Sequence, residues 1–388
     1  MKSITYFLIM TMLLFGVQAC SSSSELFKKT LDKSGKNRKQ LENVYQQLNK
    51  EQKKGFEFLL FNMPQHDLNS LSEEFLINNI TLAYKVMDEV EWGKNVPEDI
   101  FINYILPYAN LNERRDAWRP EFYNKFLRIA KQHKNSSEAA NDLNHKIFKE
   151  LKVIYSTQRS KPDQSPFESI QEGKASCTGL SILLVNACRS VGIPARIVGT
   201  PLWHNKRGNH NWVEIWDKGW HYMGAAEPAD TLNKAWFTSK ASKAIKDSKQ
   251  QAIYAATFKK TDINFPLVWN DTIKYVSAIN VTDRYTKHKN EDDKNKLHLS
   301  LRVWDKKNGR RIKAQVQVLD NQTNKEIFTG TSNGPQDDMN HVLKITLSPK
   351  KEYRLVLRYN DTIFYNKKLK TSDFSTTVKE IYVSNNMK

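Results

Sequence analysis

The sequence predicts an α+β protein in three parts: a helical N-terminal region, a core that combines a helix with an antiparallel sheet, and a C-terminal β-sandwich. Three observations predict this arrangement. Apolar residues recur at helical spacing before residue 150. An apolar run at 177–190 is followed by short strands. From about residue 265 apolar and polar residues alternate, which is the period of a β-strand.

Residues 1–19 have the features of an export signal. Lys2 precedes an apolar stretch from about Tyr6 to Val17, which is shorter than the roughly 20 residues of a membrane span. "GVQAC" followed by "SSSSE" resembles a bacterial lipoprotein signal. The resemblance implies that Cys20 is lipidated after cleavage and that the lipid anchors the protein to a membrane of the cell envelope, on the periplasmic face or on the outer surface of the outer membrane. An ordinary secretory signal is the alternative. Residues 20–35 are then expected to be a tether.

Residues 36–150 are expected to form a bundle of helices. Phe56, Leu59, Leu60 and Met63 have helical spacing, and prolines divide the region into segments. Trp118 is a candidate for a substrate groove, although a position in the core is the simpler explanation for this tryptophan.

Residues 151–275 are expected to form the core. The segment "GKASCTGLSILLVNACRS" predicts a helix that ends at "VGIP", and "ARIVGT", "HNWVEIW" and "WHYMGAA" predict strands. The last two are separated by "DKG", a hairpin signal.

Residues 276–388 are expected to form a β-sandwich of immunoglobulin type. Leu297, Leu299, Leu301 and Val303 alternate with polar residues, and about six further short strands follow with turn signals between them. This part holds no cysteine and no cluster of candidate ligands. Its simplest role is that of a spacer.

The composition describes a soluble globular protein with a basic surface. The chain has 388 residues and a formal charge of +18, with lysines scattered along the sequence. No segment combines basic and aromatic residues as nucleic-acid-binding modules do, and no nucleotide-binding glycine loop is present. Nucleic acid is therefore not an expected partner.

Two cysteines remain if Cys20 carries lipid. Cys177 and Cys188 are eleven positions apart in one predicted helix, about 16 Å, whereas a disulfide needs Cα atoms within about 7 Å. No zinc-ligand spacing is present, so no metal is expected. Apolar neighbours make Cys188 a core residue. Cys177 lies at the start of the helix, where the helix dipole favours a thiolate. A nucleophile and a core cysteine remain the two alternatives from this stretch alone.

The residues downstream favour the nucleophile. "GKASCTGLSILLVNACRSVGIPAR" followed by "GNHNWVEIWDKGWHYM" resembles the transglutaminase-like superfamily over roughly residues 150–235. The resemblance implies a papain-like/transglutaminase-like core in which Cys177 attacks an amide bond of a protein, peptide or glycopeptide, His210 exchanges the proton, and no cofactor takes part. Trp203 and Trp212 are further candidates for substrate binding.

The third catalytic residue departs from the family pattern. The usual aspartate would stand at Gly224, and the nearest acid is Glu227. A two-residue hairpin loop would place Glu227 directly opposite His210, whereas a three-residue loop would turn it to the other face of the sheet unless a bulge intervened. The sequence thus predicts a cysteine hydrolase or acyltransferase, with a non-catalytic protein that binds a peptide or glycopeptide at the cell surface as the alternative.

Overall fold

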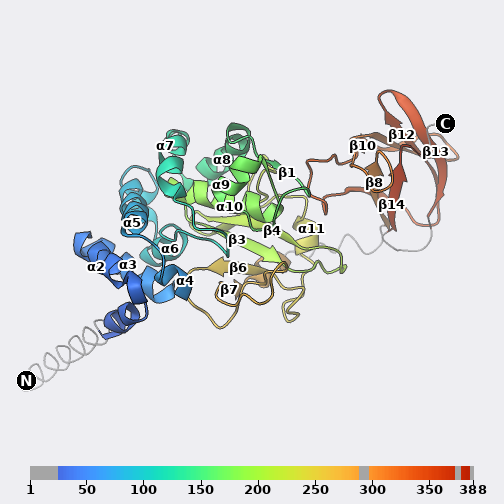
Figure 1. Cartoon of the computed structure of the whole chain (residues 1–388). Coiled ribbons are helices and arrows are strands. Elements are labelled where there is room, and N and C mark those ends of the chain that lie inside the picture. Colours follow the sequence, from blue (N-terminus) through green and yellow to red (C-terminus); the bar gives the residue numbers. More distant parts are fainter. Residues whose placement is uncertain (1–24, 288–296, 372–376, 385–388) are drawn as a thin grey trace, which may run out of the picture.

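The structure is a computed structural model that describes residues 25–287, 297–371 and 377–384 (Figure 1). The predicted signal sequence and Cys20 lie outside these ranges. Residues 25–32 are helical and Leu31 is 3% exposed, so the second half of the expected tether is a packed helix. Within the described ranges, every helix is too short or too polar to cross a bilayer.

The N-terminal region consists of helices, as predicted. They are η1 (Gly35–Asn37), α2 (Arg38–Gln47), α3 (Lys50–Asn62), α4 (Gln65–Leu68), α5 (Glu73–Met87), η2 (Gly93–Asn95), α6 (Glu98–Tyr104), α7 (Trp118–Ala130) and α8 (Ser136–Glu150). Polar side chains cap several N-termini. Asn49 accepts the amide of Gln52, for example, and the Gln52 side chain accepts the amide of Asn49. Such caps satisfy amides that the first helical turn leaves without a partner.

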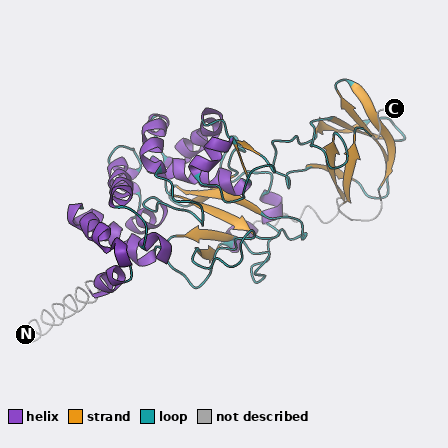
Figure 2. Cartoon of the chain, viewed as in Figure 1, coloured by secondary structure: helices purple, strands orange, loops and turns teal. Residues whose placement is uncertain are grey.

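The core is built around one buried helix and one sheet. It begins with β1 (Ile154–Tyr155), α9 (Pro166–Glu172), β2 (Lys174–Ala175) and α10 (Cys177–Ser190), and continues with β3 (Ala195–Thr200), β4 (His210–Trp216), β5 (Trp220–Met223), α11 (Thr238–Ala241), β6 (Tyr254–Thr257), β7 (Ser277–Asn280) and α12 (Thr282–Thr286). The five-stranded antiparallel sheet has the order β5-β4-β3-β6-β7. Helices α7, α8 and α10 lie on one side of it (Figure 2).

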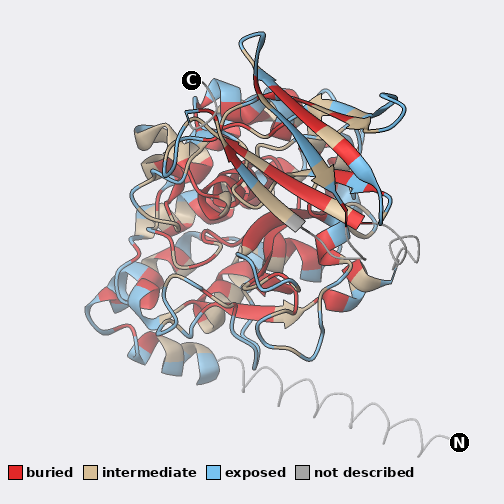
Figure 3. Ribbon diagram, turned by 90° about the vertical axis from the view of Figure 1, so that its right-hand side faces the viewer, coloured by how far each residue is buried: buried red, intermediate tan, exposed pale blue. Residues whose placement is uncertain are grey.

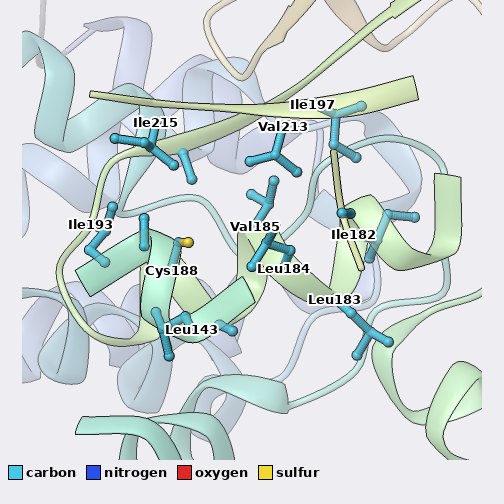
Figure 4. Packing of buried hydrophobic residues seen from close by; sticks show 14 of the residues in the cluster. Leu143, Ile182, Leu183, Leu184, Val185, Cys188, Ile193, Ile197, Val213 and Ile215 are labelled. Atoms are coloured by element: carbon cyan, nitrogen blue, oxygen red, sulfur yellow. The ribbon is translucent and has the colours of Figure 1, made fainter. Parts of the chain in front are cut away.

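Helix α10 is fixed between the sheet and the outer helices. All its residues from Thr178 to Ser190 are buried. Figure 4 shows its apolar side chains between Ile197, Val213 and Ile215 of the sheet and Leu143 of α8. Burial of this kind stabilises by about 25 cal/mol per Å² of apolar surface, so the helix that begins at Cys177 is rigidly held.

The domain boundary lies later than residue 275. Strand β7 pairs with β6 in the core sheet, and Tyr285 of α12 packs into the same domain. The core therefore extends to about residue 286, and the sandwich begins with β8 (Leu297–Trp304).

The C-terminal part is a β-sandwich of seven described strands. The others are β9 (Gln315–Asp320), β10 (Glu326–Thr331), β11 (Leu343–Leu347), β12 (Glu352–Tyr359), β13 (Thr362–Lys370) and β14 (Thr377–Tyr382). One sheet has the order β10-β9-β12-β13 and the other β11-β8-β14, with β14 parallel to β8. The alternating residues from Leu297 to Val303 face a core shared by both sheets, as predicted. Figure 3 shows the molecule with the sandwich toward the viewer, coloured by burial.

Candidate functional site

Cys177 is the first residue of α10. The helix is capped by Ser176, whose hydroxyl accepts the amide of Gly179 at 3.1 Å and donates to the carbonyl of Pro162 at 2.6 Å. The first amides of a helix have no intrahelical acceptor, and the dipole is positive there. Cys177 is a partly exposed free thiol at this end.

Cys188 has the structural role that the sequence predicts. Its side chain is fully buried among apolar residues of the core, as Figure 4 shows. Burial raises the pKa of the Cys188 thiol to about 12. This cysteine therefore stays protonated and inert at neutral pH.

His210 opens β4, and the end of this strand is tied to α10. The neighbouring Asn211 donates to the Thr178 hydroxyl at 2.8 Å. Gly199 on β3 allows this contact, since a Cβ there would lie 1.8 Å from the Asn211 side-chain oxygen. The sheet thus presents His210 at the level of the first turn of α10.

The imidazole of His210 is packed between aromatic rings. It is 2% exposed, and its ring centroid lies 4.8 Å from that of Trp236 and 5.1 Å from that of Phe237. Within the described residues neither ring nitrogen makes a hydrogen bond of good geometry. Its Nδ1 atom faces a carboxylate oxygen of Asp338 at 3.4 Å, which is an ion-pair distance.

Asp338 belongs to the C-terminal sandwich. It lies in the segment between β10 and β11, which extends from the sandwich to the core (Figure 1). The backbone amide of Asn340 donates to its Oδ1 at 2.7 Å. Arg311, which is 3% exposed, donates to the carbonyls of Asp338 and His341, both at 3.1 Å. Contacts inside the sandwich domain therefore fix the conformation of the segment that carries Asp338.

The core holds the same segment from the other side. The Met339 amide donates to the Tyr155 hydroxyl at 3.1 Å, and the Asn340 side chain donates to the Asn209 carbonyl at 2.8 Å. Lys240 donates to the Asn340 carbonyl at 2.7 Å. His341 stacks on Trp236 with ring centroids 5.1 Å apart. These contacts place Asp338, which is 2% exposed, beside His210.

Cys177, His210 and Asp338 therefore form one cluster, drawn from a helix, a strand and the second domain. One ligand atom of each residue lies within 4.8 Å of those of the other two. Burial lowers the pKa of His210, but the charges of Asp338 and Cys177 outweigh it and raise that pKa to about 10. Burial raises the pKa of Asp338, but the positive charge of His210 and the hydrogen bond from the Asn340 amide lower it overall. The cluster favours an imidazolium beside a carboxylate.

The three side chains are also ligand types for a divalent ion such as Zn²⁺. Three protein ligands with an open fourth position would suit a catalytic zinc. The geometry alone therefore fits both a zinc site and a catalytic triad. The expected catalytic use of Cys177 and His210 needs no metal, so a zinc chelator distinguishes a catalytic triad from a zinc site.

Glu227 does not occupy the expected position opposite His210. The pairs Trp216–Trp220 and Val213–Met223 show a three-residue loop, and β5 ends at Met223. The chain then turns through Ala226, whose φ is 61°. Glu227 follows the last residue pair between β4 and β5, so the pairing of these strands does not determine where its side chain points. Of the two hairpin registers that the sequence left open, the structure has the three-residue loop, so strand pairing does not place Glu227 opposite His210. His210 faces Asp338 instead.

Glu227 nevertheless lies near the site. Its Oε2 atom accepts from the indole of Trp236 at 2.7 Å, and Trp236 contacts the ring of His210. Burial raises the pKa of Glu227 to about 7, against the charge of His210, which lowers it. A Cβ at Gly224 would lie 2.5 Å from this carboxylate, so Glu227 fills the space where the family's aspartate would begin.

The three tryptophans that were candidates for substrate binding are core residues. Trp118, Trp203 and Trp212 are 2%, 1% and 0% exposed. The indole of Trp118 donates to the Tyr108 carbonyl, and Trp203 and Trp212 stack beneath His210. Trp236, which the sequence did not single out, borders the site and is half-buried.

Glu214 has a structural role, and it lies four positions along the strand from His210. Its carboxylate is fully buried and accepts from Arg196 at 2.6 and 2.8 Å, from Arg284 at 2.8 Å and from the Tyr285 hydroxyl at 2.7 Å. Burial raises the pKa of Glu214, but the two arginines outweigh it and lower that pKa. The network joins β4 to α12.

Comparison with known proteins finds similarity over part of the chain. Residues 126–225 match the family model described as the Transglutaminase-like superfamily. A candidate cysteine protease from Cytophaga hutchinsonii is 18% identical, and the match covers 48% of this chain and 64% of that chain with a TM-score of 0.28. Red sea bream transglutaminase is 9% identical, with 73% and 65% of the two chains covered and a TM-score of 0.32. The chain thus spans slightly less than two thirds of either structure.

None of the curated proteins matches the chain. The family model lies over α8, α9, α10 and the first strands of the sheet, and it includes Cys177 and His210. Asp338 lies outside the matched range. Residues 126–225 of this chain are a transglutaminase-like domain.

Proposed function

We propose that the protein is a cysteine hydrolase or acyltransferase that acts on an amide bond of a peptide or glycopeptide through a thioester at Cys177. The observation that carries this proposal is the cluster of Cys177, His210 and Asp338, whose ligand atoms lie within 4.8 Å of one another. A thiol, an imidazole and a carboxylate in this order are the parts of a nucleophilic triad.

The first half-reaction forms the thioester. The sulfur of Cys177 attacks the amide carbonyl carbon, and the oxygen takes the negative charge. The amides of Cys177 and Thr178 lie in the first turn of α10, where amides have no intrahelical acceptor, and we propose that they donate to this oxygen. The carbon–nitrogen bond then breaks, and the imidazolium of His210 gives its proton to the leaving amine. Asp338 holds the ring and stabilises its charged form.

The second half-reaction releases the acyl group. Water or an amine attacks the thioester carbon while neutral His210 takes up its proton. The carbon–sulfur bond breaks, and the thiolate of Cys177 is regenerated beside the imidazolium. Water gives hydrolysis and an amine gives transfer, and the triad serves both.

Alkylation tests the nucleophile without a known substrate. Iodoacetamide is expected to modify Cys177 at least roughly 100-fold faster than Cys188 at pH 7, since a thiolate reacts and a buried thiol does not. Peptide mapping by mass spectrometry gives both rates in one sample. Equal and slow modification of both cysteines would contradict the proposal and favour a non-catalytic binding protein. Preincubation with a zinc chelator is expected to leave the Cys177 rate unchanged, whereas acceleration would indicate a bound metal.

We further propose that Cys20 carries a lipid and holds the protein at the cell envelope. A single acyl chain binds membranes only marginally, so a stable anchor needs more than one chain. Cys20→Ser is expected to move the protein from the membrane fraction to the soluble fraction or to block its processing. Fractionation followed by mass measurement of the N-terminal peptide checks this, and a soluble, unlipidated wild-type protein would contradict it.

A further inference from the structure

A tyrosine that the proposed mechanism does not use lies beside the site. Tyr155 ends β1, which pairs in parallel with β2, so that Tyr155 stands opposite Ala175. The Ser156 amide donates to the Ala175 carbonyl at 2.9 Å and fixes this register. Cys177 follows Ala175 by two positions. The backbone of Tyr155 is therefore tied to the segment that leads into the nucleophile.

The hydroxyl of Tyr155 reaches the segment that carries Asp338. It accepts the amide of Met339 at 3.1 Å, and Met339 directly follows Asp338. The ring is half-buried and packs against the apolar core of the domain. Figure 1 shows β1 beside the segment through which the sandwich reaches the core. The side chain thus links the strand pair before Cys177 to the residue after Asp338.

The hydrogen of this hydroxyl has no acceptor among the described residues. Tyr155 accepts one hydrogen bond from them and donates none. Hydroxyls of buried tyrosines usually find a partner, because a buried donor without one costs free energy. The Met339 amide also polarises the O–H bond, since hydrogen bonds in a chain strengthen one another. A molecule that enters the site therefore meets an unused hydrogen-bond donor there.

The surroundings keep this hydroxyl protonated. Burial raises the pKa of Tyr155, and the negative charges of Asp338 and Cys177 raise it further, against smaller opposite effects of the Met339 amide and of Arg159. Both charges act on the phenol because it lies close to both residues. A phenol that stays neutral is suited to donate a hydrogen bond to a developing negative charge, and it is not suited to act as a base.

We propose that Tyr155 is a catalytic residue that donates its hydroxyl hydrogen to the oxygen of the tetrahedral intermediate. This inference rests on the proposed function and adds a side-chain donor to the amides at the start of α10. When the sulfur of Cys177 bonds to the carbonyl carbon, the second electron pair of the C=O bond moves onto the oxygen. The hydrogen bond from Tyr155 strengthens as this charge develops. When the carbon–nitrogen bond breaks, the pair returns to the C=O bond, and no proton leaves Tyr155.

Two reagents separate stabilisation of the oxygen from formation of the thiolate. Iodoacetamide alkylates the sulfur of Cys177 directly, and no oxyanion forms. p-Nitrophenyl acetate acylates the same sulfur through a tetrahedral intermediate and releases coloured nitrophenolate, which needs no proton from His210. A change in the thiolate therefore moves both rates together, whereas loss of an oxyanion donor slows acylation alone. The Cys177→Ala protein gives the background from other groups.

Tyr155→Phe removes the donor and keeps the ring that packs on the core. We expect the Cys177-dependent burst of nitrophenolate to slow by roughly 100-fold, as on removal of one oxyanion donor. The rate of alkylation should change by less than about twofold, because it depends on the thiolate. Tyr222→Phe is the matched control. It removes another half-buried hydroxyl of the same domain, bonded to Thr238 Oγ1 at 3.0 Å, and is expected to leave both rates unchanged.

Equal slowing of both reactions by Tyr155→Phe would overturn the proposal, since Tyr155 would then act only by holding the segment of Asp338. An unchanged burst rate would also overturn it, while Cys177 remained the nucleophile. If the wild-type protein shows no burst that depends on Cys177, the proposed function itself is contradicted, and the role of Tyr155 with it. Thermal unfolding of each variant checks that the compared proteins are folded.

Discussion

Replacing Cys177 by alanine is expected to abolish turnover while the fold remains intact. The thiol forms the covalent bond to the acyl group in the proposed reaction, so no other side chain of the triad can replace it. Its side chain is partly exposed at the start of α10, and the packing of that helix begins at Thr178. Turnover is measured as release of labelled peptides from casein and as incorporation of a fluorescent amine into casein.

Cys188→Ala is the matched control for this experiment. It removes the other sulfur of α10 from the core and is expected to cost about 1 kcal/mol of the free energy of unfolding through the cavity that it leaves. Turnover should persist, because this thiol is buried 11 positions away from the site. Full activity of the Cys177→Ala variant, or loss of activity in the Cys188→Ala variant at a temperature where it is folded, would contradict the assigned roles.

Much of this site was predictable because its parts are local in sequence. A buried helix that starts at Cys177 and a strand that starts at His210 both follow from short apolar patterns. The role of Cys188 follows from its apolar neighbours in the same helix. Such predictions require only the spacing of apolar residues within one helix or strand and the order of the helix and the strand along the chain.

Asp338 was not predictable for the opposite reason. It lies 128 positions after His210, in a turn of the sandwich, and no periodic pattern marks it. The sequence offered Glu227 because hairpin pairing is the only long-range contact that can be counted from a sequence. Strand β5 ends at Met223, so residue pairing with β4 no longer places the residues that follow. A sandwich that resembles a spacer in sequence thus supplies part of the site in three dimensions.

The tryptophans show a related limit. Trp203 and Trp212 occur in the family motif, and motif residues can either bind substrate or support the catalytic residues. Their full burial and their stacking beneath His210 assign them to support. Trp236 lies in an irregular segment after β5, where sequence patterns give no position.

The second large effect is expected for Asp338→Asn, which should lower turnover by roughly 100- to 10,000-fold. Asparagine keeps the size of the side chain and an oxygen that can accept the Asn340 amide. Arg311 binds the backbone carbonyl of residue 338, so its contact survives the substitution. What is lost is the negative charge beside Nδ1 of His210, at 3.4 Å.

Glu227→Gln is the matched comparison. It removes a carboxylate of the same neighbourhood, but that carboxylate is bound to Trp236, and a glutamine oxygen can accept the same indole. We expect its effect on turnover to stay below about tenfold, since it acts on His210 only through space. The reverse order, with Glu227→Gln the more damaging variant, would return the orienting role to Glu227 and leave Asp338 as a residue of the domain contact.

The pH dependence separates a role in charge stabilisation from a merely structural one. In the wild-type protein the pKa of His210 is raised to about 10, so the imidazolium contributes stability fully below the ordinary histidine value of 6.5 and loses it as the pH rises through 10. Without the charge of Asp338 that pKa falls, and the alkaline limit of turnover should move down by at least about one pH unit. An unchanged pH profile in a folded Asp338→Asn protein would show that Asp338 does not stabilise the charge of His210.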